Sequence, residues 1–172
     1  MASCVYGGPV RAAVLAHKEQ GRLALSRPLG DVLAGAVVQL LAASDPDHRP
    51  VALVPAPSAR AVTRQRGHDP LLRITRRAAI VLRRNGLDCA VVPALRHRRR
   101  VSDQAGLGQV ARMANLHGSM IARPGAATLL RGRSVVIVDD VVTTGATIGE
   151  AVRAVRLSGH DPCGAAVIAA AP

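Results

Sequence analysis

The sequence has almost no aromatic residues: of its 172 residues one is Tyr, and Phe and Trp are absent. A core of this chain must therefore be built from Ala, Val, Leu and Ile, which favours a Val-rich parallel sheet covered by helices rich in Ala and Leu. The same shortage removes the platforms on which single-strand nucleic-acid binders stack bases. It also leaves a flat nucleobase without its usual stacking partner.

Cysteine is scarce too, and Cys4, Cys89 and Cys163 are odd in number and far apart. This pattern excludes a paired disulfide framework and fits a reduced, intracellular setting. The six histidines stand singly without metal-ligand spacing, so we expect no metal site made of protein side chains alone. We see no basic leader with an apolar core and no stretch that approaches the roughly 20 apolar residues of a membrane span. The sequence predicts a cytoplasmic protein without a membrane contact.

Acidic residues are few, and the net charge is +12. Lys18 is the only lysine, and twelve arginines lie between Arg60 and Arg100, against only Asp69 and Asp88. Such a block attracts polyanions. An arginine-rich composition with its charges on solvated helix faces explains the block equally well. Nucleic acid therefore stays open as a partner, with weak support.

The length suits one domain, residues 1–172, with a core large enough to fold alone. Residues 1–45 predict a helical N-terminal segment, with helices over Val10–Gln20 and Leu29–Ala43, where apolar residues recur at helical spacing. Residues 51–172 are expected to form the core of the domain. We find no internal repeat and no linker long enough to separate a second domain.

Three short apolar runs predict central strands with aligned carboxyl ends, at Val51–Val54, Ala90–Pro93 and Val135–Val138. Each run is followed by polar or loop-forming residues and then by a helical pattern, for example over Leu71–Asn85. Two prolines end the first run within residues 55–58. We therefore expect an α/β fold with a mainly parallel sheet flanked by helices.

The third run leads directly into Asp139 and Asp140. A buried strand cannot hold two unpaired carboxylates, so both are expected to emerge at the carboxyl edge, where open α/β sheets bind ligands. A small, hydroxylated loop then enters a helix N-terminus, whose free N–H groups and dipole favour a phosphate. The loop consists of Thr143, Thr144, Gly145, Ala146 and Thr147. Since acceptor-only carboxylates suit vicinal hydroxyls, the stretch predicts a site for a ribose phosphate.

Residues 135–147 resemble the phosphoribosyl pyrophosphate (PRPP) motif of type I phosphoribosyltransferases. The resemblance implies binding of PRPP with Mg²⁺, an ion held mainly through PRPP and water. It also implies transfer of the phosphoribosyl group to a nitrogen acceptor, a base or an amine, with release of pyrophosphate. Asp139 and Asp140 would then hold the ribose hydroxyls, and residues 143–147 the 5-phosphate.

Two further stretches would handle the pyrophosphate under this resemblance. The loop at Pro57 and Ser58, with the nearby Arg64 and Arg66, would bind it. One arginine of the loop Arg98, Arg99 and Arg100 would stabilise the charge that the pyrophosphate gains as it leaves. No covalent nucleophile is needed, because such a transfer depends on positioning and charge.

Three blocks narrow the resemblance to the ComF (competence protein F)-like phosphoribosyltransferases. Val54–Pro57 is followed by Arg64-Gln65-Arg66-Gly67, and Gln104–Leu107 is followed by Arg112 and Asn115. The family's N-terminal zinc module would precede Tyr6, and of its cysteines only Cys4 remains. The resemblance implies that this chain lacks the module, which was either lost from the protein or cut from this chain.

One departure keeps other functions open. After Gly67 the family continues with a Phe-Asn-Gln-like sequence, whereas this chain has His68-Asp69-Pro70. A PRPP sensor without acceptor chemistry would keep the motif and lose the acceptor pocket. A DNA-uptake accessory protein, which the competence resemblance also implies, would use the arginine block instead. The acceptor cannot be read from the sequence, and a homodimer is a further option.

Overall fold

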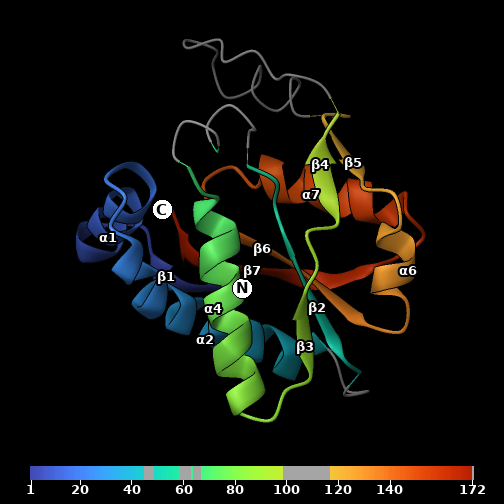
Figure 1. The fold of residues 1–172 in the computed structure, drawn as a ribbon, viewed down its shortest axis with the longest axis horizontal. Helices are drawn as coiled ribbons and strands as arrows, with labels where there is room; N and C mark the ends of the chain where they lie inside the picture. The colour runs from blue at the N-terminus through green and yellow to red at the C-terminus, as the bar shows by residue number, and fades with distance from the viewer. Residues whose placement is uncertain (45–48, 59–62, 64–66, 99–116, 172) are drawn as a thin grey trace.

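A five-stranded parallel sheet forms the centre of the computed structural model, which describes residues 1–44, 49–58, 63, 67–98 and 117–171 (Figure 1). The strand order is β1-β7-β6-β2-β3. These strands are β1 (Ala2–Val5), β2 (Val51–Pro55), β3 (Cys89–Val91), β6 (Ser134–Val142) and β7 (Pro162–Ala170). A separate antiparallel pair consists of β4 (Leu95–His97) and β5 (Met120–Ala122). The expected α/β fold with a mainly parallel sheet is confirmed.

Helices cover both faces of the sheet, as the alternation along β6 requires. Val136 and Val138 belong to a core cluster with α1 (Gly8–Glu19), α2 (Ser26–Ser44) and α4 (Pro70–Arg84). Val135 and Ile137 belong to a second cluster on the opposite face. That cluster includes residues of α6 (Ala126–Leu130) and α7 (Ala146–Arg156). The three helices predicted before residue 86 are therefore confirmed as α1, α2 and α4, with ends shifted by one to three residues. The short 3₁₀ helix η1 (Leu23–Leu25) lies between α1 and α2.

The order of the strands corrects one prediction. The run Ala90–Pro93 was expected to be central, but β3 contributes only Cys89–Val91 and lies at the edge beside β2. The place beside β6 belongs to β7, which the sequence did not indicate. Its sequence is mostly Ala and Gly, residues with low strand propensity. Small residues are needed there because α2 packs closely, and a Cβ on Gly164 would lie 2.7 Å from Leu40 Cδ1.

Strand β6 is longer than the sequence predicted, since it runs past Val138 to Val142. Its ladder with β2 ends at Pro55 and Val138, whereas its ladder with β7 continues to Val142 and Ala170. The proline at the end of β2 explains the difference, because proline cannot donate to a ladder. Asp139 and Asp140 therefore lie in a strand that is paired on one side only.

Helix α2 corrects the expectation that no segment approaches a membrane span. Residues Leu23–Ser44 form one helical stretch that is long and apolar enough to cross a membrane by length and composition. Leu33, Ala36 and Val37 in it are fully buried, and the helix packs against β7 and α4. In this fold its apolar face belongs to the core.

Two glycines in α2 provide a matched test of how closely α2 and α4 pack. A Cβ on Gly30 would lie 2.5 Å from Arg77 Cγ and 2.7 Å from Arg77 Cβ, whereas a Cβ on Gly35 would meet only Ser3 Oγ at 3.9 Å. We expect Gly30→Ala to lower the free energy of unfolding by about 1–3 kcal/mol through overpacking. Gly35→Ala should raise it by up to about 1 kcal/mol through helix propensity. Urea unfolding of both variants measures this, and equal effects would contradict the close packing at Gly30.

Candidate functional site

A pocket of about 300 Å³ lies at the carboxyl edge of the sheet, where the β2–β6 ladder ends. Strand β6 supplies its acidic wall, the loop after β2 supplies a second wall, and the N-terminus of α4 supplies a third. The lining residues are Lys18, Ala56, Pro57, Ser58, Pro70, Leu71, Asp139, Asp140, Val141 and Thr147. The structure therefore brings together five of the residues predicted for the site: Pro57, Ser58, Asp139, Asp140 and Thr147.

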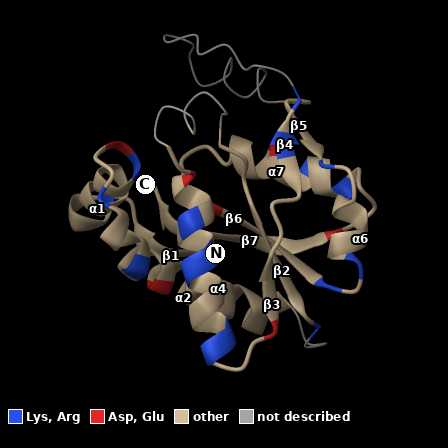
Figure 2. Cartoon of the chain, viewed as in Figure 1, with Lys and Arg blue, Asp and Glu red and all other residues tan. Residues whose placement is uncertain are grey.

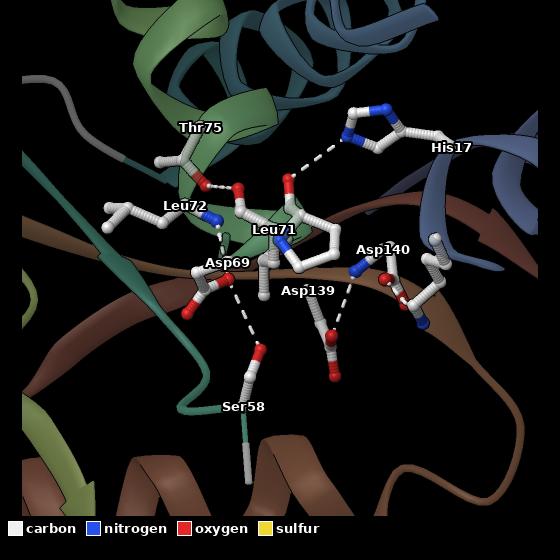
Figure 3. Close-up of polar contacts among 10 residues, drawn as sticks. His17, Ser58, Asp69, Leu71, Leu72, Thr75, Asp139 and Asp140 are labelled. Carbon is white, nitrogen blue, oxygen red and sulfur yellow. Dashed lines mark hydrogen bonds and ion pairs between the residues drawn. The ribbon is translucent and has the colours of Figure 1, made fainter. Parts of the chain in front are cut away.

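The two aspartates have different surroundings (Figure 3). Asp140 is 6% exposed, and its carboxylate forms an ion pair with Lys18 Nζ at 2.6 Å. Asp139 is less enclosed by this measure and accepts a hydrogen bond from the backbone N–H of Asp140 at 2.9 Å. The sequence argument held that both acids must emerge because they are unpaired. Asp140 does lie at this edge and lines the pocket, but it is not unpaired, since Lys18 compensates its charge.

Asp139 is the unusual acid of the pair. Burial and the neighbouring charge of Asp140 raise its pKa from 3.8 to about 7, although the hydrogen bond from Asp140 and the charge of Lys18 oppose the rise. A carboxyl group with such a pKa changes its charge near neutral pH. Within the described residues, no three His, Cys, Asp or Glu side chains gather into a metal site.

The loop after β2 is held against α4 by one aspartate (Figure 3). The Ser58 hydroxyl donates to Asp69 Oδ1 at 3.2 Å, and the same oxygen accepts the Leu72 N–H at 3.0 Å as the N-cap of α4. On the sheet side, the Ala56 N–H donates to the Val138 carbonyl at 2.9 Å. Asp69-Pro70 is a strong helix-start signal, an N-cap acid followed by proline. The departure at His68-Asp69-Pro70 thus has a structural role that the sequence could have indicated.

The predicted phosphate loop stands at the start of α7. Gly145 has φ of +75°, a conformation that favours glycine, and serves as the N-cap residue. Thr144 Oγ1 accepts the Ala146 N–H at 3.3 Å. A second groove, of about 410 Å³, is lined by Thr144, Gly145 and Ala146 together with His117 and side chains of α7. Thr147 instead lines the pocket of Asp139 and Asp140, called the aspartate pocket below. Thr143 is exposed in the turn that precedes them.

The wall of this second groove is fixed by Glu150. Its buried carboxylate accepts the Met120 N–H at 2.8 Å and pairs with Arg153 at 2.7 Å, which ties β5 to α7. Burial alone would raise the pKa of Glu150, but hydrogen bonds from Arg153 and from the backbone of Met120 lower it overall. The carboxylate therefore stays charged near neutral pH and holds the groove in shape.

The predicted arginines fall into two groups. Arg64, Arg66, Arg99 and Arg100 lie outside the described residues. Arg98 is exposed just after β4, and its backbone N–H donates to the Ser119 carbonyl at 2.7 Å. The preceding residue, His97, contacts the Pro57 carbonyl through Nε2 at 2.8 Å. This contact places the start of the arginine run beside the loop of Pro57 and Ser58.

Lys18 is the residue of the pocket to which sequence reasoning gave no role. It lies in the last turn of α1, next to the fully buried His17. The His17 ring contacts the Arg22 carbonyl at 3.2 Å and the Pro70 carbonyl at 3.4 Å, so the end of α1 is docked on the start of α4. Its signals in the sequence were that it is the only lysine and that, with residues 6–11, it resembles the segment after the family's zinc module. A pair formed across such a distance in sequence cannot be read from local pattern.

Removing this lysine should destabilise the fold. Lys18→Met leaves the Asp140 carboxylate buried without its partner, and we expect a loss of roughly 1–3 kcal/mol, reduced because the Lys18 side chain is 32% exposed. Combining it with Asp140→Asn should restore much of the loss, since no uncompensated charge remains. Urea unfolding of both single variants and the double variant measures the coupling. If the two substitutions change the free energy of unfolding additively, the ion pair between Lys18 and Asp140 does not stabilise the fold.

Comparison with known proteins agrees with this geometry. Residues 75–172 match the model of the phosphoribosyl transferase domain family, which covers more than half of the chain. A stretch of 39 residues is 54% identical to an adenine phosphoribosyltransferase of Mycobacterium marinum (strain ATCC BAA-535 / M). That stretch is 23% of this chain and spans about a fifth (21%) of the length of that relative.

Proposed function

Since the chain belongs to the phosphoribosyl transferase domain family, we propose that it binds PRPP and transfers the phosphoribosyl group to a nitrogen acceptor, with release of pyrophosphate. One observation carries the proposal: Asp139, Thr147 and Ser58 line a single pocket at the carboxyl edge of the sheet. Parallel α/β sheets bind their ligands at this edge. An acid for hydroxyls, a helix start for a phosphate and a hydroxyl-bearing loop for a diphosphate therefore lie within reach of one small molecule.

Each part of the pocket suits one part of PRPP. Asp139 would accept hydrogen bonds from the ribose hydroxyls once it is ionised. The loop of residues 143–147 would hold the 5-phosphate at the start of α7, where backbone N–H groups and the helix dipole favour an anion. Pro57 and Ser58 would face the pyrophosphate, and Asp69 fixes the Ser58 hydroxyl for that task.

Mg²⁺ fits this pocket as an ion held mainly by the ligand, because it prefers oxygen ligands and keeps much of its water. The donors present agree: Asp139 and Ser58 offer oxygen atoms, whereas Asp140 is already paired with Lys18. When bound, the ion would offset part of the pyrophosphate charge. Asp139 and Ser58 are the residues whose oxygen atoms would coordinate the ion from the protein side.

Catalysis would rest on charge and position. Breaking the bond at the anomeric carbon leaves positive charge on the ribose and negative charge on the departing pyrophosphate. The Asp139 carboxylate would face the ribose, and Arg98 follows the strand whose His97 contacts the Pro57 carbonyl. Arg98, with Arg99 and Arg100, would stabilise the leaving group while the acceptor nitrogen attacks.

We also propose that the chain is of the ComF-like kind, on the blocks of sequence described above. One observation favours the alternative of a PRPP sensor without turnover: Lys18 pairs with Asp140, so one acid of the motif is not free to hold ribose. Both functions require PRPP binding. Only the transferase requires an acceptor.

Pyrophosphate release decides between them. Wild-type protein with Mg²⁺ and PRPP should release pyrophosphate when a suitable nucleobase or amine is added and should do so much more slowly without it. A panel of purines, pyrimidines and simple amines, with pyrophosphate detected by a coupled assay, covers the acceptor classes. If the protein binds PRPP by calorimetry yet no acceptor gives release, the transferase proposal fails and the sensor takes its place.

A further inference from the structure

A basic groove of about 420 Å³, distinct from the groove at the start of α7, lies on the outer side of α4. Figure 2 shows where basic residues lie along the ribbon of this helix. Three of them, Arg73, Arg76 and Arg77, line the groove and follow the i, i+3, i+4 spacing that puts side chains on one helix face. The remaining lining residues are Ser26, His68, Asp69, Leu72 and Ile80. The groove is separate from the aspartate pocket, although the start of α4 forms a wall of both.

Packing between two helices holds Arg77 in place. Its Cβ and Cγ lie against Gly30 of α2, a position where any side chain would collide with them. The nearest carboxylate, Asp31, lies 3.5 Å from Arg77 Nε and is itself half exposed. Among the described residues, this buried Nε has no hydrogen-bond partner. A guanidinium group that is held rigidly and only loosely paired is prepared for an anion.

The rim beside the three arginines is also rigid. Asp69 is fixed by the Leu72 N–H and by the Ser58 hydroxyl, so the turn at His68 and Asp69 cannot easily move away. The carboxylates of Asp69 and Asp31 repel an anion, but three guanidinium groups outweigh these two charges. Arg73 and Arg76 line the groove and are exposed, so a ligand in the groove can reach them.

We propose that this groove binds a small ligand carrying two or more phosphate groups, at a site additional to the one for PRPP. One guanidinium group can donate two parallel hydrogen bonds to two oxygens of a phosphate. Three such groups on one helix face therefore suit a ligand whose phosphates are neighbours in one polyphosphate. The volume is that of a small-molecule site. Single-stranded nucleic acid fits less well, because among the described residues no Phe, Tyr or Trp lines the groove to stack on bases.

The test uses inorganic tripolyphosphate as the probe, without Mg²⁺, followed by ¹⁵N–¹H NMR of the full chain. Amide signals of Leu72, Arg73 and Ile80 report on the groove, and those of residues 144–147 report separately on the phosphate loop. The variant is Arg73→Gln with Arg76→Gln, which removes two exposed charges and leaves the packed Arg77. The matched control is Arg84→Gln with Arg131→Gln, which removes the same charge from exposed positions outside the groove.

We expect the groove signals of wild type and control to shift with the same Kd within about twofold. In the Arg73→Gln/Arg76→Gln variant, the Kd at the groove should rise at least about tenfold, since each lost charged hydrogen bond weakens binding severalfold. Signals of the phosphate loop should respond equally in all three proteins, so the result does not depend on the proposed function. Equal Kd values at the groove in variant and control would overturn the proposal. So would tighter binding of a single-stranded DNA 20-mer that both variants weaken alike, because this would indicate a diffuse polyanion surface.

Discussion

Asp139→Asn is expected to weaken binding of PRPP with Mg²⁺ by at least about tenfold at pH 8 and to remove most of its pH dependence. An amide keeps the size of the side chain but replaces an acceptor by a donor where ribose hydroxyls need acceptors. Hydrogen bonds to a charged acceptor are worth roughly 1.5–3 kcal/mol, which corresponds to tenfold or more in affinity. The pKa of Asp139 near 7 makes the effect depend on pH.

The sign of this dependence follows from the ionised form being the one that binds. Below pH 7 wild-type Asp139 is mostly protonated, so its affinity for PRPP should increase as the pH rises from 6 to 8. The asparagine variant should show only the pH dependence that comes from the phosphates of PRPP. Calorimetric titrations at pH 6, 7 and 8 measure both. The control is Asp161→Asn, which removes a carboxylate from an exposed ion pair with Arg156.

Stability should move in the opposite direction. The pKa of Asp139 is about 7 in the folded protein and 3.8 is its ordinary value, so between these pH values the folded state binds more protons than the unfolded state. The stability contribution of this group therefore falls as the pH rises towards 7. Asp139→Asn should accordingly unfold at a higher temperature than wild type at pH 8, and the difference should be smaller at pH 5. A variant that loses both stability and affinity at pH 8 would instead indicate a structural role.

The parts of the fold that local sequence determines were predicted correctly. The apolar runs at Val51–Val54 and Val135–Val138 are buried strands, and the wide apolar stripe before residue 44 is a core helix. Strand β7 was not predicted, because Ala and Gly have low strand propensity. These small residues leave room for α2, whose Leu40 approaches Gly164 closely. The need for small residues in a strand because a helix packs against it is a matter of tertiary structure, and the local sequence pattern does not show it.

The site shows the same division. Asp139, Thr147 and the loop at Pro57 and Ser58 follow from where strands end, and the structure places them in one pocket. The pairing of Asp140 with Lys18 depends instead on how α1 docks, through His17, against the start of α4. The rule that a buried charge must be compensated was correct. Its partner simply came from a distant helix rather than from solvent or ligand.

Substitution of Arg98, Arg99 and Arg100 is expected to have a large effect on the rate of pyrophosphate release. We expect replacement of all three by Ala to lower kcat for pyrophosphate release by a factor of about 100 or more, while the affinity for PRPP changes by less than about fivefold. The reason is that these charges are assigned to pyrophosphate as it departs, and interactions made mainly in the transition state are lost from kcat rather than from binding. The contact of His97 with the Pro57 carbonyl sets the start of this run, at Arg98, beside the loop of Pro57 and Ser58.

A matched variant separates this role from a general loss of positive charge. Arg22→Ala, Arg84→Ala and Arg131→Ala together remove the same charge from exposed positions outside the pocket. Steady-state kinetics give kcat, and calorimetry gives the PRPP affinity, for wild type and both triple variants. If the three arginines instead form a solvated or nucleic-acid face, turnover will survive their removal, and only salt-sensitive binding of single-stranded DNA will fall. In that case the charge on the departing pyrophosphate must be met by groups other than this loop.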